Sequence, residues 1–329
     1  MDATSKTDSL DPSRKDGNLQ RHRPRFRIVS SVLLGLMLIA FGCRSAACAG
    51  EPGNSLMERL AQKNSSGPST LFRWSYEEPD DEPETSKLDE PLVTDRPDFT
   101  EASTTVGQGV AQLELGYTYT SDRNNGDSMA EHSFGEPLLR YGVGADWFEL
   151  RFALRPTHVR QSVGGVTQTD SGVSDLYLGV KLALTAQQGI FPEMALVPQM
   201  TVPTGSRAFT NDEVLAGVNW LYSWDVTDEL SIAGSSQFNR SLDDSGDSYI
   251  QFAQSLSAGY AFTDELGAYA EWYVLTPASS SAAPTEHYID GGFTVLLNND
   301  VQWDIRAGKG VSSAAADYFV GTGLSVRFH

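Results

Sequence analysis

The stretch Tyr318–Phe328, YFVGTGLSVRF, lies one residue before the carboxyl end of this 329-residue chain. Every second side chain from Tyr318 to Phe328 is apolar, aromatic or threonine, and small or polar residues such as Gly321, Gly323 and Arg327 stand between them. Successive side chains of a β-strand point to opposite faces. The stretch therefore predicts a strand with one apolar face and one face of small or polar residues.

Runs with the same two-residue period extend back to about residue 108. In residues 147–155, for example, apolar side chains alternate with Glu149, Arg151 and Arg155. Most runs are about 10 residues long or slightly longer, which is the length of a tilted transmembrane strand. We expect about twelve strands, near residues 109–120, 133–143, 147–157, 173–185, 192–202, 214–225, 230–240, 249–262, 266–276, 286–297, 301–309 and 317–328.

Short turns and long polar loops alternate between these strands. The short turns fall near residues 144–146, 227–229, 263–265 and 298–300. The longer loops fall near residues 121–132, 157–172, 203–213, 241–248, 277–285 and 310–316. In outer-membrane barrels the short turns face the periplasm and the long loops face outside. The sequence thus predicts an all-β fold, an antiparallel transmembrane β-barrel with both termini periplasmic. The connection that fits this pattern least well is residues 185–191, which is longer than the other periplasmic turns.

A soluble β-sandwich or lipocalin-like barrel has the same period, but its apolar face points inward. The polar faces carry many charges, which suit either a wet lumen or a soluble surface. These charged residues are Glu114, Glu136, Arg140, Arg151, Asp175, Lys181, Glu193, Glu271, Asp304, Arg306 and Arg327. Strand length, loop asymmetry, aromatic residues near strand ends and the amino-terminal segment together favour the membrane barrel.

Residues 1–49 contain the three parts of a secretory signal peptide. A basic cluster ends at Arg27, an apolar run covers residues 28–42, and Ala47-Cys48-Ala49 forms a cleavage site. The run is shorter than the roughly 20 residues of a transmembrane helix, which disfavours an uncleaved anchor. Cleavage after Ala49 would remove both cysteines, Cys43 and Cys48, and with them disulfides and thiol chemistry.

Residues 50–92 are expected to form an acidic, flexible periplasmic linker, and residues 93–329 the barrel with its amino-terminal segment. The linker contains the proline-broken acidic stretch 77–84 and few apolar residues to bury. The whole chain has a net charge of −19, and 8 of its 24 Lys and Arg lie in residues 1–49. So acidic a chain repels nucleic acid, and we expect no nucleic-acid partner.

The segment LVTDRPDFTEAS at residues 92–103, followed by GVAQLELGY at 109–117, resembles the opening of the MetA-pathway phenol-degradation family. The stretch VPQMTVPTG at 197–205 also resembles a strand end of that family. The resemblance covers roughly residues 92–328 and is most specific in the core TDRPDFTE. It implies an outer-membrane, transporter-like barrel. It does not name a solute.

Two interpretations remain open for residues 95–101. Asp95, Arg96, Asp98 and Glu101 could enter or cap the periplasmic mouth and set the charge of a pore. Alternatively, the segment is an ordered turn before the first strand, stiffened by Pro97. The lumen charges likewise either line a permeation path or pair with one another and fill the barrel. Arg140, Arg151 and Arg155, on the second and third predicted strands, are the candidate basic stripe.

The sequence favours an outer-membrane channel or transporter for small solutes, hydrophobic or aromatic ones among them. A non-conducting structural or adhesive barrel is the alternative, and a barrel-embedded hydrolase is a third hypothesis. There is no G-x-S-x-G elbow, H-E-x-x-H motif, P-loop or dinucleotide fingerprint. We therefore predict no catalytic residues, no metal and no cofactor. The expected partners are outer-membrane lipid, the barrel-assembly machinery and a small-molecule solute.

Overall fold

A computed structural model describes residues 70–72, 90–124, 126–243, 245–278 and 284–329. The predicted signal peptide, residues 1–49, and most of the predicted linker lie outside the described residues. The described residues form strands, turns and bends, without a helix. In this part of the chain, no helix has the length and apolar character that crossing a membrane requires.

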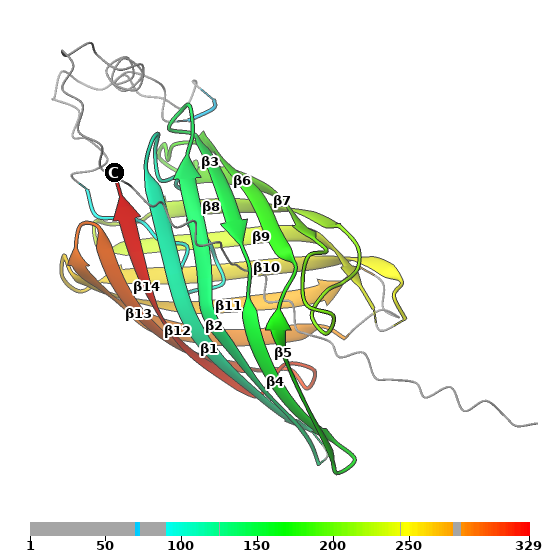
Figure 1. Cartoon of the computed structure of the whole chain (residues 1–329). Coiled ribbons are helices and arrows are strands. Elements are labelled where there is room, and N and C mark those ends of the chain that lie inside the picture. Colours follow the sequence, from blue (N-terminus) through cyan, green and yellow to red (C-terminus); the bar gives the residue numbers. More distant parts are fainter. Residues whose placement is uncertain (1–69, 73–89, 125, 244, 279–283) are drawn as a thin grey trace, which may run out of the picture.

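One antiparallel sheet closes on itself to make a barrel (Figure 1). Closure is made by β1 and β14, which are paired from Ala111 opposite Phe328 to Ser121 opposite Tyr318. The strands are β1 (Ala111–Asn124), β2 (Asp127–Gly142), β3 (Phe148–Ala153), β4 (Pro156–Val163), β5 (Val166–Val173), β6 (Leu176–Thr185), β7 (Glu193–Val202), β8 (Leu215–Asp225), β9 (Leu230–Leu242), β10 (Ser248–Ala261), β11 (Leu266–Pro277), β12 (Glu286–Asn298), β13 (Val301–Gly310) and β14 (Tyr318–Phe328).

These strands occupy twelve positions in the wall, as predicted. β3 and β4 follow one another along β2, β3 pairing with residues 138–142 and β4 with residues 128–133. Their partners β6 and β5 likewise share one position, because β3 pairs with β6 and β4 with β5. Each pair is one pass of the chain, interrupted by an irregular step at residues 154–155 and 174–175.

The prediction of outer loops at residues 121–132 and 157–172 was wrong, because both stretches form strands. Most of residues 121–132 belongs to the hairpin of β1 and β2, and most of 157–172 to the hairpin of β4 and β5. The second hairpin turns at Gly164 and Gly165, both at positive φ, which glycine adopts without a steric penalty. The polar composition suggested loops, but cross-strand pairing extends the wall into two hairpins that project together at one end (Figure 1).

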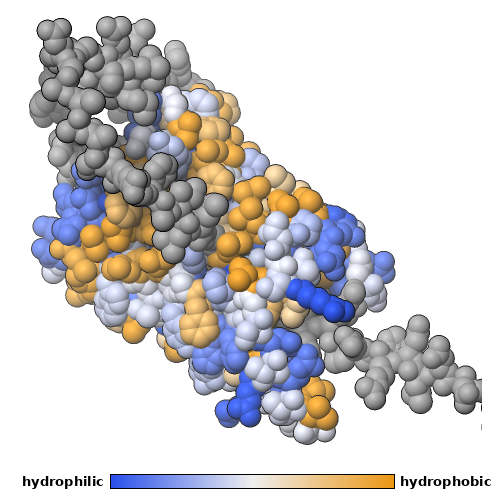
Figure 2. All heavy atoms as spheres, in the orientation of Figure 1, coloured by the Kyte–Doolittle hydropathy of each residue, from blue (hydrophilic) through white to orange (hydrophobic). Residues whose placement is uncertain are grey.

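The barrel has an apolar outer face and a polar interior. In β3, Glu149 and Arg151 are buried while Phe148, Leu150 and Phe152 point outward. In β14 the outward Tyr318, Val320, Leu324 and Phe328 are exposed, as the alternation predicts. Figure 2 shows apolar residues over the strands and hydrophilic residues gathered toward the ends. Because large apolar side chains cover the strands on the outside, the wall fits a hydrocarbon environment.

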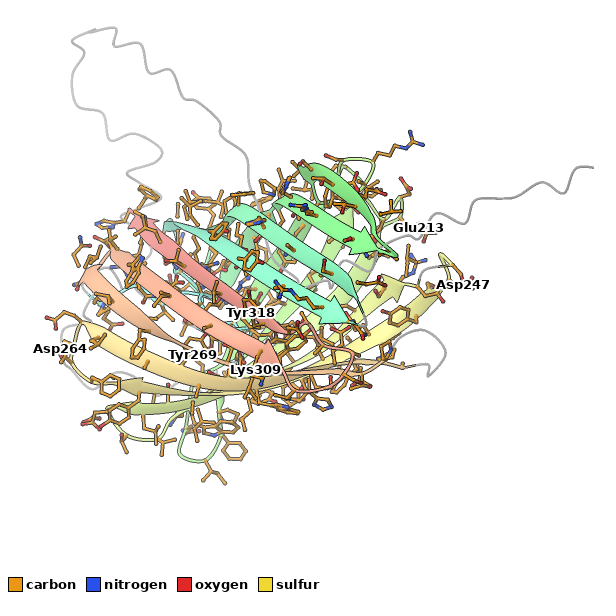
Figure 3. All side chains as sticks on the ribbon, turned by 90° about the horizontal axis from the view of Figure 1, so that it is seen from below. Glu213, Asp247, Asp264, Tyr269, Lys309 and Tyr318 are labelled. Atoms are coloured by element: carbon orange, nitrogen blue, oxygen red, sulfur yellow. The ribbon has the colours of Figure 1, made fainter. Side chains whose placement is uncertain are left out.

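The two rims of the barrel differ, as the loop pattern predicts. Figure 3 places Glu213 and Asp247, in longer loops, at the rim opposite Asp264, in a short turn. The inner turn predicted at residues 185–191, the connection that fits the loop pattern least well, lies between β6 and β7 and is closed by a bridge between Gln188 and Phe191. By the rule for outer-membrane barrels, we take the short-turn rim as periplasmic.

Candidate functional site: a chain segment inside the barrel

Residues 93–106, here called the lumen segment, run through the barrel interior before β1 begins. The chain enters at the short-turn rim, where the Leu92 amide donates to the Asn299 carbonyl over 2.8 Å. It returns to the same rim, where Gly109 and Gly142 are joined by a backbone hydrogen bond of 2.9 Å. The structure thus places residues 95–101 inside the lumen, which is the location that the first of the two interpretations gives them.

Carboxylates of the wall hold the backbone of the lumen segment. Glu114 accepts from the Asp95 amide over 3.0 Å, and Glu271 accepts from the Phe99 and Thr100 amides over 2.6 and 2.8 Å. Glu149 accepts from the Val106 amide over 3.0 Å. Buried backbone N–H groups need partners, and no regular secondary structure supplies them here. Wall side chains therefore replace the missing strand pairing.

Asp95 is the centre of a buried charge cluster. Its carboxylate lies 2.6 Å from Arg151, 2.7 Å from Lys181 and 3.3 Å from Arg140. All three cations have no exposed surface. Burial alone would raise the pKa of Asp95, but the three cations outweigh it and hold the pKa well below the usual range. Removing one member of such a cluster leaves uncompensated buried charge, which costs about 3–5 kcal/mol.

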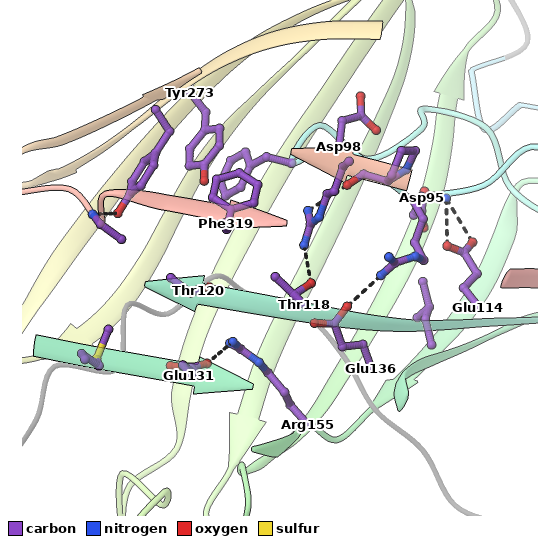
Figure 4. Close-up of a pocket in the computed structure, with 18 residues that line it drawn as sticks. Asp95, Asp98, Glu114, Thr118, Thr120, Glu131, Glu136, Arg155, Tyr273 and Phe319 are labelled. Atoms are coloured by element: carbon purple, nitrogen blue, oxygen red, sulfur yellow. Dashed lines mark hydrogen bonds and ion pairs between the residues drawn. The ribbon is translucent and has the colours of Figure 1, made fainter. Parts of the chain in front are cut away.

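Arg96 lies on the opposite side of the segment, against the seam of the barrel. Its guanidinium lies 2.9 Å from Glu136 and 3.2 Å from Asp304, and it donates to the Thr322 carbonyl. Burial alone would lower the pKa of Arg96, but the two carboxylates outweigh it and raise the pKa. Glu136 reaches it from an irregularity in β2, where the pairing with β1 shifts register. Such bulges re-aim side chains, and here the bulge directs Glu136 to Arg96 (Figure 4).

The three arginines predicted as a basic stripe are each paired with carboxylates. Arg140 contacts Glu114 and Glu149 in addition to Asp95. Arg151 lies 3.1 Å from Glu101, whose pKa is raised by burial. Arg155 pairs with Glu131, away from the Asp95 cluster (Figure 4). The wall therefore presents paired charges rather than an open basic lane, because these carboxylates lie against it from neighbouring strands and from the lumen segment.

Asp98 has a different environment from the ion-paired Asp95. Its carboxylate accepts from the Ser257 hydroxyl over 3.1 Å, but Asp290 is the carboxylate that faces it most strongly. Burial and Asp290 raise the pKa of Asp98 to about 7, against the weaker opposing effect of Arg306. The end of the segment at residues 98–100 is thus held by hydrogen bonds in acidic surroundings. Among the described residues, no ion pair engages residues 97–100, in contrast to Asp95 and Arg96.

Two cavities meet at residues 96–98. The first, about 100 Å³, lies toward the outer rim and is also lined by Thr118, Glu131 and Arg155. The second, about 310 Å³, lies between the segment and the short-turn rim, where Thr227 of a short turn and Tyr260 of β10 line it. Arg96, Pro97 and Asp98 line both cavities. These three residues therefore separate an outer space from a periplasmic one.

Aromatic rings form one wall of the outer cavity. Phe99 of the lumen segment stacks on Tyr273, with ring centroids 4.4 Å apart, and Tyr273 stacks on Tyr288 at 4.8 Å. Phe319 packs beside Tyr288, and the Arg306 guanidinium lies 5.4 Å from the centre of the Phe319 ring. The opposite wall carries hydroxyl and charged groups (Figure 4). Such a cavity suits a flat solute with one apolar face and one polar edge.

Sequence reasoning missed this aromatic wall. Tyr273 shares the inner face of β11 with Glu271, and Phe319 interrupts the small and polar inner face of β14. A large aromatic residue on the polar face of a barrel strand was therefore the available signal. Which rings meet across the lumen depends on the closure of the barrel, which brings β11, β12 and β14 around residue 99.

The fold and the segment held in its lumen define an outer-membrane-type β-barrel with a folded-in amino-terminal segment. The family model "Putative MetA-pathway of phenol degradation" matches residues 94–328, so the chain belongs to that family, as its opening motif suggested.

Among solved structures, the COG4313 outer membrane channel of Pseudomonas putida F1 is similar, with TM-score 0.57 and 12% identity over 69% of this chain and 98% of that one. The translocator domain of the autotransporter NalP from Neisseria meningitidis has TM-score 0.46 and 13% identity over 68% of this chain and 89% of that one. No curated protein matches the chain.

Proposed function

We propose that this protein is an outer-membrane channel for small solutes that carry an apolar or aromatic surface. The observation that carries the proposal is the outer cavity, with the stacked rings of Phe99, Tyr273 and Tyr288 on one side and polar groups on the other. A wall that only closed a barrel would need no aromatic site beside the lumen. The similar barrel from Pseudomonas putida is itself an outer membrane channel, which supports the same proposal.

The route runs from the outer cavity past residues 96–98 into the larger periplasmic cavity. Passage requires the segment to move, because Arg96, Pro97 and Asp98 stand between the two spaces. The Asp95 cluster resists movement, since it contains three fully buried cations. The neighbouring residues 97–100 are held by hydrogen bonds to Ser257 and Glu271. We therefore assign gating to a local shift of residues 97–100, with Asp95 staying in place.

Planar-bilayer recordings and proteoliposome uptake of a small phenolic solute test this function. The folded full-length barrel is compared with a variant in which Thr100, whose hydroxyl contacts Ser255 and Glu271, is replaced by glycine. We expect low conductance from the unmodified protein and more frequent openings and faster uptake from the variant. Absence of ion and solute flux from both proteins would rule out the channel proposal.

One observation favours the alternative of a non-conducting structural or adhesive barrel. Paired charges fill the lumen around Asp95, and the side chains of Arg140, Arg151 and Lys181 have no solvent-exposed surface. In addition, the β1–β2 and β4–β5 hairpins project at the outer rim, where they could contact partners outside (Figure 1). If the alternative holds, removal of the projecting hairpin tip at residues 161–168 abolishes attachment to an external surface while uptake stays absent throughout.

The location that this role requires is the outer membrane, in contact with its lipid. We propose that the chain is exported through cleavage after Ala49 and folded by the barrel-assembly machinery, which the alternating aromatic-ended β14 suits. Residues 50–92 would then tether the barrel on the periplasmic side. Mass spectrometry of the amino terminus of protein extracted from outer membranes tests both the cleavage position and the location.

A further inference from the structure

Two histidines lie side by side on the outer surface of the projecting hairpins. His132 of β2 and His158 of β4 are direct cross-strand partners. Their sequence neighbours Glu131, Ser133 and Thr157 are buried inside the barrel. Because side chains alternate along a strand, both imidazoles face outward, and both are partly exposed. They therefore belong to the outer face of the wall and are separate from the lumen.

Each histidine has a hydroxyl group at the same ring nitrogen. Nδ1 of His132 lies 2.8 Å from the Tyr117 hydroxyl, and Nδ1 of His158 lies 2.7 Å from the Ser171 hydroxyl. Within the part of the chain that the structure describes, no hydrogen bond engages Nε2 of either ring. A hydroxyl oxygen can accept from Nδ1–H, which leaves the lone pair on Nε2. This is how second-shell groups orient metal-binding histidines.

The spacing of the two rings matches a shared ion. Their centroids are 6.1 Å apart, and the ring planes are tilted by 52°. Two metal–nitrogen bonds of about 2.0 Å, added to the ring radii, span roughly 6 Å when the N–metal–N angle is wide and roughly 5 Å when it is tetrahedral, so the rings approach one another by up to about 1 Å on binding. Binding of one ion by both rings requires the side chains to turn until each Nε2 atom lies about 2.0 Å from the same point. The remaining coordination positions would face outward.

Tyrosine and phenylalanine rings surround the pair. The ring centroids of Tyr119 and His132 lie 4.9 Å apart, and the Phe134 ring stacks on His132 with centroids 6.0 Å apart. These contacts restrict rotation of the His132 ring, so less side-chain freedom is lost when a ligand binds. An aromatic girdle by itself would account for tyrosine and phenylalanine at this level of the barrel. It would not account for two opposed histidines that each have a hydroxyl partner at Nδ1.

We propose that His132 and His158 form a surface site for a divalent transition-metal ion of the zinc, copper or nickel type. Imidazole nitrogen is a preferred ligand for these ions, whereas calcium and magnesium require oxygen ligands. Nε2 of each histidine binds the ion, and Tyr117 and Ser171 position the rings from Nδ1. Water or an anion from outside completes the coordination shell. Since the site lies on the outer face, it does not depend on conduction through the lumen.

Calorimetric titration of the folded, full-length barrel in detergent with Zn²⁺ tests the site. We expect one saturable site that His132→Gln and His158→Gln each weaken by at least about tenfold, as loss of one of two ligands requires. His287→Gln is the matched control, because His287 also belongs to the outer face, stacked on Trp272 and in a different part of the wall. It should bind Zn²⁺ as the unmodified protein does. Heat-modifiable migration on a gel shows that each variant is folded.

A second measurement separates coordination from general affinity of an acidic protein for cations. Electron paramagnetic resonance with one equivalent of Cu²⁺ should show two imidazole nitrogens, and only one in either single variant. Tyr117→Phe keeps the ring and removes the Nδ1 partner of His132, so it should weaken Zn²⁺ binding by about tenfold while both nitrogens remain in the copper spectrum. Equal Zn²⁺ affinity in the His158→Gln variant and the unmodified protein would overturn the proposal. So would an equal loss in His287→Gln.

Discussion

Gly116 and Gly323 lie directly opposite each other where β1 and β14 close the barrel. A Cβ atom added to either glycine would overlap the guanidinium of Arg96, which occupies the space above the pair. At Gly323 it would also lie 2.7 Å from an Asp304 carboxylate oxygen. Gly116 and Gly323 thus form a slot at the seam of the barrel. The slot accommodates the Arg96 side chain, which fixes the lumen segment two residues before Asp98.

This slot predicts the effect of the smallest possible substitution. Gly116→Ala or Gly323→Ala should displace Arg96 from Glu136 and Asp304, since the crowding is inside a packed lumen. We expect a loss of about 1–3 kcal/mol, typical of overpacking, and more frequent channel openings. Urea unfolding and bilayer recordings measure the two effects. Gly259→Ala is the control, because its Cβ meets only the flexible end of Ser231. Openings that increase equally in the control would contradict the slot.

Asp95 should be the residue whose charge matters most for stability. Asp95→Asn removes the carboxylate that faces Arg140, Arg151 and Lys181, and the amide can no longer neutralise them. We expect a loss of about 3–5 kcal/mol, the usual cost of breaking a buried ion pair from one side. The temperature of heat-modifiable migration reports it. Asp247→Asn, in an outer-rim loop, should leave that temperature unchanged. A stable Asp95→Asn protein would show that the cluster does not depend on this carboxylate.

The raised pKa of Asp98 predicts that pH changes the hold on the lumen segment. Burial and Asp290 raise that pKa from 3.8 to about 7, so the folded segment favours the protonated carboxyl. Stability from this group is therefore present at low pH and is lost as pH rises from about 4 through 7. Above pH 7 the ionised Asp98 faces Asp290 and Glu271, with Arg306 as the nearby cation and Ser257 as its hydrogen-bond donor.

We accordingly expect channel openings to become more frequent between pH 5 and about pH 8. Asp98→Asn stays neutral and keeps a similar shape, so its openings should be rare and nearly independent of pH over that range. Recordings at several pH values, with Asp264→Asn in a periplasmic turn as control, compare the three proteins. An Asp98→Asn variant with the pH response of the unmodified protein would rule out Asp98 as the titrating group.

Neighbouring residues of β14 allow a test of the aromatic cavity. Phe319 faces the cavity and is buried, whereas Tyr318 is exposed on the outer face. Phe319→Ala removes one ring of the wall and should weaken binding of a small phenolic solute by about tenfold, since aromatic contacts contribute about 0.5–1.5 kcal/mol beyond area burial. Tyr318→Ala should leave solute binding unchanged. Calorimetry with phenol as the probe compares the two variants, and equal affinities would place the solute elsewhere.

The wall of this barrel could be predicted from local patterns in the sequence. Alternation in runs such as Tyr318–Phe328 assigns the outward residues, because the two-residue period of a strand is a local property of the backbone. The same alternation identified Glu114, Lys181 and Glu271 as inward charges, and all three are buried. Turn length indicated which rim is which. The prediction of an outer loop at residues 157–172 was wrong, because this polar stretch pairs as the β4–β5 hairpin. Strand pairing depends on the partner strand and not on composition alone.

The roles of the inward residues depend instead on how the closed barrel brings distant parts of the chain together. The sequence left residues 95–101 as either a lumen segment or a turn, since a short irregular stretch has no period from which its partners can be inferred. Asp95 meets Lys181, 86 positions away, and Arg96 meets Asp304, 208 positions away. Closing the sheet brings these groups together in a space shielded from water. There each charge must find a partner, because unpaired charge is costly to bury.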